Sequence, residues 1–496
     1  MMQSVKLTSH KGISSYWLDR KGLCTGTLIF GVGMRNEPPT LAGITHLLEH
    51  LLLRMVQPVT VPHGGMVNAD SLQFYASGQP EDVAGFLNEI AAAASTLEAL
   101  TEEDLALEKA VLEAEDSHKF RTVSAGLLTY RYGTNGVGAA HFGAPATASL
   151  TTAETSEWAG RWLTSGNAAL TFTGPLPVSL DLCLPPAKPV KRAQDSPLIK
   201  APTLIMSRKQ GIALSLLVPS HDARFLGEAL QYELLVRLRH SRGLIYSVEN
   251  FTTPIDAHQS QLDFILDPLR ANIVLVLREV LEALHGIAEA GFSENAVQST
   301  RHALLSELGW DDFVPQDYLD QLAIDALLNR TTADRQELLD RAAAMSSAEL
   351  TKILKGSMAS LIVALDKSVK LSKKVGEKLA LTIDGYEIWQ RHHDPENHHG
   401  AEERDAEYPT WRHKSSDATL SLTPTRLLWR DSGKTKVISL ADVVVVGHRS
   451  CGCISLMDRR GRSSELSVDD WKASKKLRRK LLGAFPPENI RSFPED

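Results

Sequence analysis

The chain is poor in several features that define other classes of protein. Its four cysteines in 496 residues are too few and too scattered for a disulfide framework. No apolar run is long enough to cross a membrane, no apolar signal core follows Met1, and the net charge of -7 disfavours nucleic acid as the main partner. These absences predict a cytoplasmic protein that has no integral membrane segment and does not bind nucleic acid.

What is present indicates several globular domains. A chain of 496 residues is too long for one core, and 43% hydrophobic and 23% charged residues are typical of globular proteins. A proline-rich stretch at 185–202 and a polar, histidine-rich stretch at 384–410 interrupt the hydrophobic periodicity and are predicted linkers. They leave three predicted domains, 1–184, 203–383 and 411–496.

The second predicted domain repeats the pattern of the first. A strand at 23–32 precedes an apolar helix, an extended stretch at 66–77 follows, and helices are expected at 80–98 and 102–120. A strand at 212–218, a helix at about 223–240 and a helix after Phe292 follow the same order at a distance of about 185 residues. We infer an internal duplication of α+β class, in which only the first copy has the histidines described next.

The most informative segment reads His46-Leu-Leu-Glu49-His50 and lies in an apolar stretch. On an α-helix the two imidazoles and the carboxylate emerge from one face. Neutral imidazoles are good zinc ligands, and an adjacent acid can deprotonate a zinc-bound water. The apolar flanks predict a buried helix, in which unpaired polar side chains are costly. The segment therefore predicts a metal site with its own base.

A catalytic zinc needs a third protein ligand and one open position. The helix expected at 102–120 offers Glu108, Glu113 and Glu115. Glu108 and Glu115 are two turns apart and share a face, whereas Glu113 points nearly opposite to Glu115. An apolar stripe borders the face of the first two acids: Leu107, Val111 and Ala114. We expect both acids to point partly inward, although two solvated acids on a surface helix fit the same pattern.

Four segments together resemble the pitrilysin and insulysin family of zinc peptidases, peptidase family M16, which includes the mitochondrial processing peptidases. The segments are Gly33-Met-Arg-Asn-Glu37, Gly43-Ile-Thr-His-Leu-Leu-Glu-His50, Gly64-Gly-Met-Val-Asn-Ala69 and Glu108-Lys-Ala-Val-Leu-Glu-Ala-Glu115. The order His-x-x-Glu-His is the inverzincin signature. The resemblance covers about residues 1–375 and implies two tandem M16-type domains, an M16B-type half-clamshell.

The resemblance also implies roles for single residues. Glu115 closes a Glu-x6-Glu pattern as the third zinc ligand after His46 and His50, and Glu108 is its companion behind the ligands. The span from His50 to Glu115 is 65 positions (115 − 50), which is shorter than is usual in the family.

Four further residues correspond to substrate-binding positions of the family. Arg239 and Tyr246 resemble its substrate-binding Arg and Tyr, which approach the zinc from the opposite half of the clamshell. A helix-end arginine and a core tyrosine are the alternative interpretation. Asn68 and Ala69 are expected on an edge strand that pairs with an extended substrate.

These observations predict a zinc-dependent metalloendopeptidase with one Zn²⁺ per chain, in which Glu49 is the general base and Tyr246 and Arg239 assist at the oxyanion. Because the family clamshell needs four such domains, we expect a homodimer, with a heterodimer of related M16 subunits left open. Peptides or flexible precursor segments are the expected substrates, and leader-peptide removal is one such reaction. The alternatives are a non-catalytic peptide-binding or scaffolding subunit and a metal site that only stabilises the fold.

The C-terminal region carries weaker signals. Short strands and a closing helix that begins at the cap Ser467-Val-Asp-Asp470 faintly resemble a pleckstrin-homology or GRAM-like barrel. The basic residues of that helix fit either an acidic ligand or a solvated face. Cys451-Gly-Cys453 near His448 is a weak candidate for a second metal site, and the histidines of the 384–410 linker fit a hydrophilic spacer better than a metal site.

Overall fold

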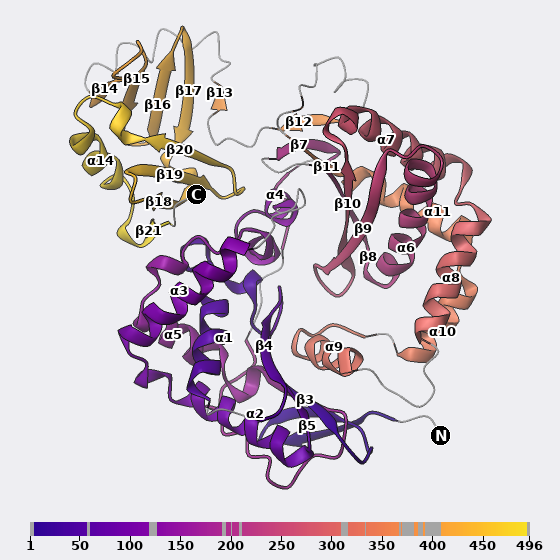
Figure 1. Ribbon diagram of the computed structural model, residues 1–496. Coiled ribbons are helices and arrows are strands. Elements are labelled where there is room, and N and C mark those ends of the chain that lie inside the picture. The colour runs from indigo at the N-terminus through magenta and orange to yellow at the C-terminus, as the bar shows by residue number, and fades with distance from the viewer. Residues whose placement is uncertain are drawn as a thin grey trace.

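The structure is a computed structural model. It describes residues 4–56, 60–118, 126–190, 195–199, 201–207, 211–308, 316–332, 334–366, 369, 381–384, 390–391 and 408–493. Two six-stranded sheets, each flanked by helices, account for most of these residues (Figure 1). We call the parts built on these sheets the first half and the second half, and the described residues 390–391 and 408–493 the C-terminal module. The predicted α+β class is confirmed.

The first half has the strand order β1-β2-β6-β3-β5-β4, in which only the β2–β6 pair is parallel. Its strands are β1 (Lys6–His10), β2 (Ile13–Trp17), β3 (Cys24–Phe30), β4 (His63–Val67), β5 (Leu72–Gly78) and β6 (Ala168–Phe172). Its helices are α1 (Ile44–Met55), α2 (Pro80–Ser95), α3 (Glu102–His118), α4 (Leu127–Tyr132) and α5 (Thr152–Trp162). At the start of α3, the N–H of Asp104 donates to Thr101 Oγ1 (3.1 Å) and the N–H of Thr101 donates to Asp104 Oδ2 (3.3 Å), a capping box.

The second half has the order β12-β7-β11-β8-β10-β9. Its strands are β7 (Thr203–Ser207), β8 (Ile212–Pro219), β9 (Ile245–Pro254), β10 (Gln259–Pro268), β11 (Ile362–Asp366) and β12 (Thr382–Asp384). Its helices are α6 (Ala223–Leu234), α7 (Ile273–Ala290), α8 (Glu294–Leu308), α9 (Gln316–Leu327), α10 (Arg335–Ala344) and α11 (Ser347–Ser357). Five strands, β7-β11-β8-β10-β9, have the order and relative directions of β2-β6-β3-β5-β4, which agrees with the inferred duplication.

One helix of each half packs against the sheet of the other half. Helix α4 follows α3 in the first half but packs on the second sheet, where Leu127 joins Ile205 in a core cluster. Helix α9 follows α8 in the second half but packs on the first sheet, where Ala323 joins Ile29. The exchange buries apolar side chains of both halves and therefore joins the two sheets into one body.

A buried ion-pair network also connects the two halves. Arg35 contacts Asp70 (2.6 Å) and Asp195 (2.7 Å), and Arg330 of the second half contacts Asp70 (2.5 Å). All four side chains are nearly enclosed, so removal of one partner would leave an uncompensated charge. Asp195 lies in the predicted linker 185–202, which here supplies a structural contact rather than only a spacer.

The C-terminal module contains two separate sheets and one helix. The sheets have the orders β13-β17-β16-β15-β14 and β20-β19-β18-β21, and the described strands do not form the closed barrel that we predicted. The strands are β13 (Gln390–Arg391), β14 (Thr410–Arg412), β15 (Thr419–Leu422), β16 (Arg426–Asp431), β17 (Lys434–Ser439), β18 (Val443–His448), β19 (Cys453–Asp458), β20 (Ser463–Ser467) and β21 (Ile490–Ser492). Trp471 and Leu477 belong to the core of this module.

The closing helix α14 (Ser474–Leu482) starts later than predicted. Ser467 precedes only a short 3-10 turn, Val468–Asp470, so the predicted cap is wrong. The reason is that Ser467 is still paired in β20 with Cys453, and the chain must turn at Trp471 before a helix can begin. The histidines of the predicted 384–410 linker lie outside the described residues.

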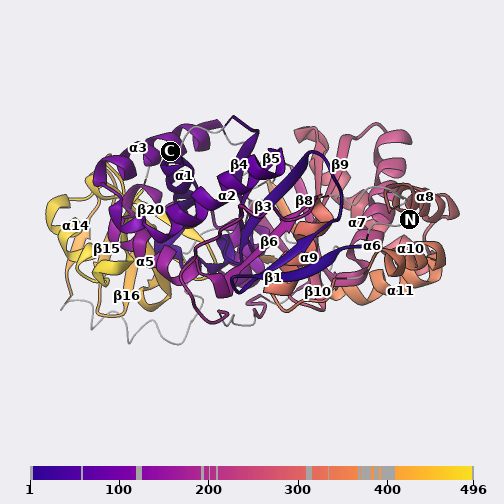
Figure 2. The same cartoon turned by 90° about the horizontal axis from the view of Figure 1, so that it is seen from below.

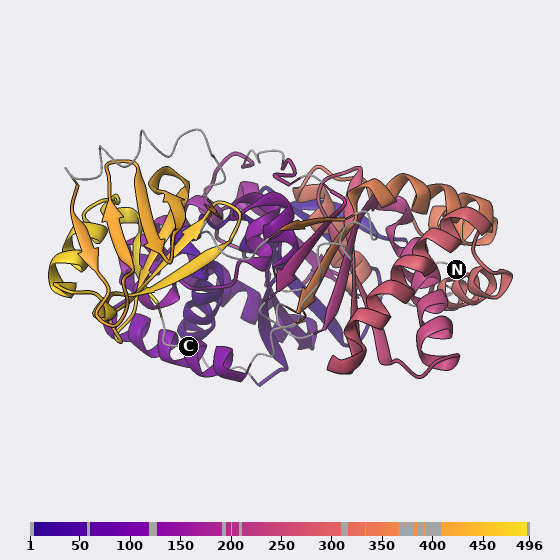
Figure 3. The same ribbon diagram turned by 90° about the horizontal axis from the view of Figure 1, so that it is seen from above.

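The C-terminal module is docked on the first half. Figures 2 and 3 show it beside the first half, at the far end from α8 and α10. Arg491 pairs with Glu154 at the start of α5 (2.7 Å), and the N–H of Ser492 donates to Ser149 Oγ (2.6 Å). Among the described helices, none combines the length and the apolar character that crossing a membrane requires.

Candidate metal centre

Helix α1 begins at a residue that has to be glycine. Gly43 has φ +102°, and a Cβ there would lie 2.3 Å from Thr147 Oγ1. The buried Glu37 carboxylate satisfies the first backbone donors, since it accepts hydrogen bonds from the N–H groups of Gly43 (2.7 Å) and Thr45 (2.9 Å). Burial raises the pKa of Glu37 to about 7. Sequence reasoning quoted Glu37 in a motif but gave it no role, because its capping contact reaches over six positions.

The apolar face of α1 explains why its polar residues converge. Five side chains of this helix are fully enclosed against the first sheet and α2: Ile44, Leu47, Leu48, Leu51 and Leu52. Each buried aliphatic side chain of this size contributes about 1.5–3 kcal/mol, so this face fixes the rotation of the helix. The predicted burial of α1 is confirmed. The imidazoles of His46 and His50 emerge together on the face toward α3, with ring centroids 4.9 Å apart.

Three candidate ligands meet between α1 and α3. Glu115 Oε2 lies 3.5 Å from His46 Nε2 and 3.5 Å from His50 Nε2. The nearest ligand atoms of the three residues all lie within 4.8 Å of one another. Tetrahedral zinc bonds of 2.0–2.2 Å would hold such atoms about 3.4 Å apart, so a small cation fits among them with little movement.

Glu49 is the buried acid beside this cluster. Its Oε2 lies 3.6 Å from His46 Nε2, and the residue is only 7% exposed. A Cβ on Gly65 of strand β4 would lie 2.4 Å from Glu49 Oε1. The glycine therefore makes room for the carboxylate between α1 and β4. The Gly64-Gly65 pair was visible in the sequence, but its role depends on this tertiary contact.

Glu108 lies behind His50. Its Oε2 is 3.3 Å from His50 Nδ1, and its Oε1 is 3.3 Å from Arg54 Nη1. A carboxylate at Nδ1 favours the tautomer whose Nε2 lone pair faces the cluster. Glu108 is 8% exposed, whereas the Glu115 side chain is 42% exposed at the mouth of the site.

We predicted that an apolar stripe of α3 borders the face of these acids and packs inward, and this prediction is wrong. Leu107 and Val111 are 46% and 49% exposed, and α3 instead buries Leu105, Glu108 and Leu112. Glu108 is directed inward on the face of Leu105 and Leu112, where Arg54 and His50 of α1 pair with it.

The charges of this centre favour a cation. Glu49, Glu108 and Glu115 surround two imidazoles, and Arg54 pairs with Glu108. Like charges that are partly desolvated repel one another, and a divalent ion would offset this repulsion. Two imidazole nitrogens and a carboxylate oxygen form a donor set that suits zinc.

The free edge of the first sheet runs beside this centre. Strand β4 is the last strand in the sheet order, and its ladder with β5 covers His63–Val67. Asn68 and Ala69 lie beyond this ladder, in the turn to β5, so their predicted place on the edge strand is wrong. Their carbonyl groups accept hydrogen bonds from the N–H groups of Met34 (3.1 Å) and Arg35 (3.0 Å). Among the described strands, none pairs with the outer edge of residues 63–67.

Arg239 and Tyr246 form a pair on the second half. The guanidinium of Arg239 lies over the Tyr246 ring, 5.0 Å from its centroid, and Tyr246 is 73% exposed on edge strand β9. The alternative interpretation, in which Tyr246 is a core residue, is therefore wrong. Figure 1 shows β9 and α1 in opposite halves of the chain, so the pair lies apart from the His46 cluster.

A π-helical turn and a buried acid position Arg239. The α-helical geometry of α6 ends at Leu234, and Leu235–His240 form a π-helix, where one uninterrupted α-helix was predicted. Buried Glu279 of α7 pairs with Arg237 (3.1 Å) and Arg242 (2.6 Å) on either side of Arg239. These pairs leave the Arg239 head exposed over Tyr246. Sequence reasoning missed Glu279, which lies on the buried face of α7, whereas Arg278, Glu282 and Glu289 of the same helix are exposed.

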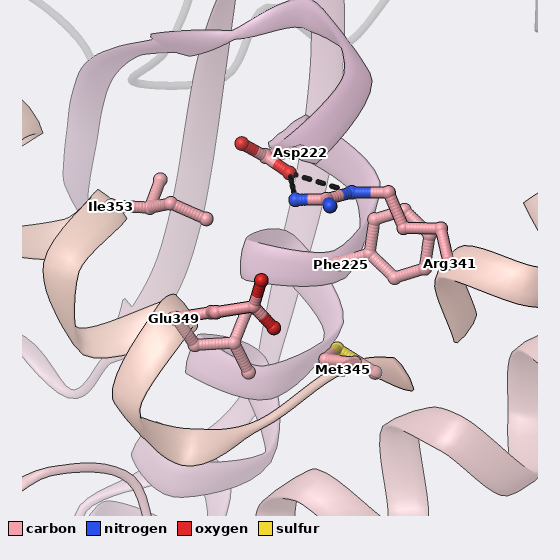
Figure 4. A pocket seen from close by; sticks show the side chains of 7 residues that line it. Asp222, Phe225, Arg341, Met345, Glu349 and Ile353 are labelled. Carbon is pink, nitrogen blue, oxygen red and sulfur yellow. Dashed lines mark hydrogen bonds and ion pairs between the residues drawn. The ribbon is translucent and has the colours of Figure 1, made fainter. Parts of the chain in front are cut away.

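A small pocket in the second half is too small for a substrate. It is lined by seven residues, and Figure 4 shows Arg341 directed toward Asp222 within it. Arg341 Nε donates to Asp222 Oδ1 at 3.0 Å, and the guanidinium lies 5.9 Å from the Phe225 ring centroid. Its cavity volume is about 10 Å³, enough for roughly one water molecule. The contacts of Arg341 connect α10 to the start of α6, and the pocket is not a candidate ligand site.

Comparison of the sequence with protein-family models and with curated proteins found no match. Solved structures do match. A protease from Helicobacter pylori has a TM-score of 0.63 and 14% identity, with 74% of this chain and 100% of that chain covered. A peptidase M16 inactive domain from Pseudomonas fluorescens has a TM-score of 0.61 and 14% identity, with 74% and 99% covered. The periplasmic protease PqqL from Escherichia coli has a TM-score of 0.58 and 13% identity, with 88% and 56% covered. The fold of this chain is thus that of M16 peptidase domains.

Proposed function

We propose that this protein is a zinc-dependent metalloendopeptidase that holds one Zn²⁺ with His46, His50 and Glu115. One observation carries the proposal: ligand atoms from α1 and α3 converge within 4.8 Å, directly beside the buried Glu49 carboxylate. A metal site that only stabilised the fold would need the three ligands but would have no use for this additional buried acid.

The residues of the chain divide the work of peptide-bond hydrolysis. Zinc, when bound, supplies a Lewis acid and lowers the pKa of a coordinated water. Glu49 accepts the proton from the attacking water and returns it to the leaving amine. Glu108 keeps His50 in its binding tautomer. The Tyr246 hydroxyl and the Arg239 guanidinium of an opposing half donate hydrogen bonds to the tetrahedral oxyanion.

The free edge of β4 is the proposed substrate track. An extended peptide can add to an open strand edge through main-chain hydrogen bonds, and residues 63–67 place that edge next to Glu49 through Gly65. Such pairing accepts peptides and flexible segments but not folded domains. Removal of a leader from a precursor peptide fits this requirement. Asn68 and Ala69 would act at the end of the track rather than along it.

The proposed active assembly is a dimer. Arg239 and Tyr246 lie in the opposite half from His46, and the chain covers only 56% of the PqqL protease but nearly all of single M16 domain structures. A second chain would bring its own Arg239 and Tyr246 to the first zinc. Because one chain carries both sets of residues, we propose a homodimer before a heterodimer with a related M16 subunit.

A non-catalytic peptide-binding or scaffolding subunit is the second candidate function. The observation in its favour is that one structural neighbour is an inactive M16 domain. The intact set of His46, Glu49, His50 and Glu115 favours catalysis.

The deciding experiment is Glu49→Gln. The variant keeps the three ligands, so we expect the zinc content of the wild type and a loss of peptidase activity of about 10²–10⁴-fold. Glu113→Gln, an exposed acid on the same α3 helix as Glu115, is the matched control and should keep full activity. Zinc content is measured by atomic spectroscopy and cleavage with a peptide library. Undiminished cleavage by Glu49→Gln would refute the general-base role.

The shared site has its own test. A Glu49→Gln chain is mixed with an Arg239→Ala/Tyr246→Ala chain, each inactive alone. In a hybrid dimer one site combines intact Glu49 with intact Arg239 and Tyr246, so part of the activity should return. Absence of recovery after mass spectrometry has confirmed subunit exchange would argue against the dimeric site.

We also propose three finer assignments. We place the domain boundaries at 1–184, 203–383 and 411–496. For the C-terminal module we propose a pleckstrin-homology or GRAM-like relationship, supported by its two sheets and helix α14. A cytoplasmic location is supported by the four cysteines, all of which are free thiols.

A further inference from the structure

A second group of metal-ligating side chains lies in the C-terminal module, away from the His46 cluster. Cys451 lies in the turn between β18 and β19, Cys453 is the first residue of β19, and the neighbouring strand β20 carries Glu465. One sulfur atom from each cysteine and one carboxylate oxygen lie within 4.8 Å of one another. Among the described residues, this group and the His46 cluster are the two sets of at least three such side chains that meet this distance.

The turn is built to bring the two thiols together. Gly452, between the cysteines, has φ +89°, and a Cβ there would lie 2.4 Å from Arg478 Nη2. The same Arg478 donates to the Gly452 carbonyl (2.7 Å), and the N–H of Arg449 donates to the Cys453 carbonyl (3.0 Å). The chain therefore holds this turn closed from two sides, which fixes both cysteines at one end of the β18–β19 hairpin.

The third donor comes from strand pairing rather than from sequence proximity. In the β19–β20 register Cys453 is opposite Ser467 and Ser455 is opposite Glu465, so Glu465 is a diagonal neighbour of Cys453. His448, which the sequence places near the cysteines, is engaged elsewhere, because its Nε2 is 3.1 Å from Ser492 Oγ.

We propose that Cys451, Cys453 and Glu465 form a second metal site, which binds a thiophilic divalent cation of the zinc class. Two thiolates and one carboxylate are a ligand set that zinc accepts, with a fourth position left to solvent. Each thiol loses its proton to solvent when the ion binds, so loading releases protons. Bound metal would fasten the β18–β19 turn to β20, next to Arg478 of the basic helix α14.

This site is independent of the proposed peptidase centre. It uses different elements and sulfur ligands, whereas His46, His50 and Glu115 offer nitrogen and oxygen only. Thiolate ligation is visible by spectroscopy, because Co²⁺ bound to thiolates gives an intense near-ultraviolet charge-transfer band. The two sites can therefore be told apart in the full-length chain, and failure of one proposal leaves the other intact.

The test loads chelator-stripped, reduced full-length protein with Co²⁺ or Zn²⁺ alone. We expect about two zinc ions per chain in the wild type and about one in either His46→Ala/His50→Ala or Cys451→Ser/Cys453→Ser. The thiolate band should persist in the histidine variant and vanish in the cysteine variant. Glu465→Gln should keep the band but weaken Co²⁺ binding by about tenfold or more.

Cys183→Ser is the matched control. Cys183 is also an exposed thiol next to a carboxylate, since its Sγ lies 3.4 Å from Asp181 Oδ1, but it has no second cysteine beside it. The control should retain both metal ions and the band. An unchanged zinc content in Cys451→Ser/Cys453→Ser would overturn the proposal. So would a Cys451–Cys453 disulfide that persists in reductant, shown by thiol titration, because it would consume both ligands.

Discussion

The two halves of this protein share a topology but use the same pair of helices differently. In the first half α1 and α3 meet through His46, His50, Glu108 and Glu115. In the second half the corresponding α6 and α8 meet through an apolar core, and the exposed ion pair of Arg224 with Glu307 lies at their surface. A common fold thus does not imply a common site, because the site depends on a few side chains at one helix contact.

The starts of α1 and α6 also differ, in how each binds its buried acid. Buried Glu37 binds two backbone N–H groups at the start of α1, whereas buried Asp222 pairs with the Arg341 side chain at the start of α6. An ion pair neutralises Asp222. The Glu37 carboxylate has hydrogen bonds from Gly43 and Thr45 for this purpose, but burial has the larger effect and raises its pKa. The comparison indicates that the acid at the start of α1 is held by hydrogen bonds, whereas the acid at the start of α6 is held by an ion pair.

The sharpest way to break the comparison is to remove a proposed ligand. His50→Ala should lower the zinc affinity of the His46 centre by more than about 100-fold, since loss of even a residue that only contacts a ligand costs 10–100-fold, and peptide cleavage should be lost with this metal. Calorimetric zinc titration and peptidase assays measure both effects. His240→Ala, an exposed histidine at the end of the π-helix in the second half, is the control and should bind zinc normally. Equal zinc affinity in the two variants would remove His50 from the site.

A pH titration of stability tests the buried acid of the first half. Burial raises the pKa of Glu37 from 4.5 to about 7, so the native state keeps a proton that the unfolded chain loses above pH 4.5. The free energy of unfolding should therefore fall as pH rises from 4.5 to about 7, by up to about 3 kcal/mol from this group. Urea denaturation of the metal-free protein across this range measures the slope.

Glu37→Gln cannot ionise and should lose this part of the slope, while Glu113→Gln should retain it. A wild-type slope identical to that of Glu37→Gln would show that Glu37 is already ionised in the native protein at low pH.

The smallest effect is expected at the surface pair of the second half. Arg224→Ala breaks the contact with Glu307, but both side chains are about half exposed or more. Solvent screens such a pair, so the free energy of unfolding should change by less than about 1 kcal/mol, and zinc binding should not change. A loss of zinc upon this substitution would mean that the second half helps to shape the metal centre and that the two helix contacts are not independent.

Much of the fold was predictable from sequence because its elements have strong local signals. The helices at 80–98 and 102–120 were placed within a few residues, and Thr101 and Asp104 form a capping box at the start of the second helix. The cluster of His46, His50 and Glu115 was predicted from helical spacing and a family resemblance, and these residues lie together. Local hydrogen bonding and side-chain periodicity operate within a few residues, so sequence reveals them.

The sequence-based predictions fail where contacts between segments far apart in the sequence determine the position of a residue. Leu107 and Val111 look like a core stripe but are exposed, because α3 meets α1 through Glu108. Asn68 and Ala69 look like strand residues, but hydrogen bonds from Met34 and Arg35 hold them in a turn. Neither fact can be read from hydrophobic periodicity.

The sequence by itself determined the chemistry available to this protein. It places two imidazoles and one acid on one face of an apolar helix, and two further acids two turns apart on another helix. Only the tertiary structure decided that Glu115 reaches both imidazoles, that Gly65 makes room for Glu49, and that Glu465 joins the two cysteines of the C-terminal module. The physical reason is that covalent spacing fixes which side chains share a face, whereas the packing of distant helices and strands fixes which faces meet.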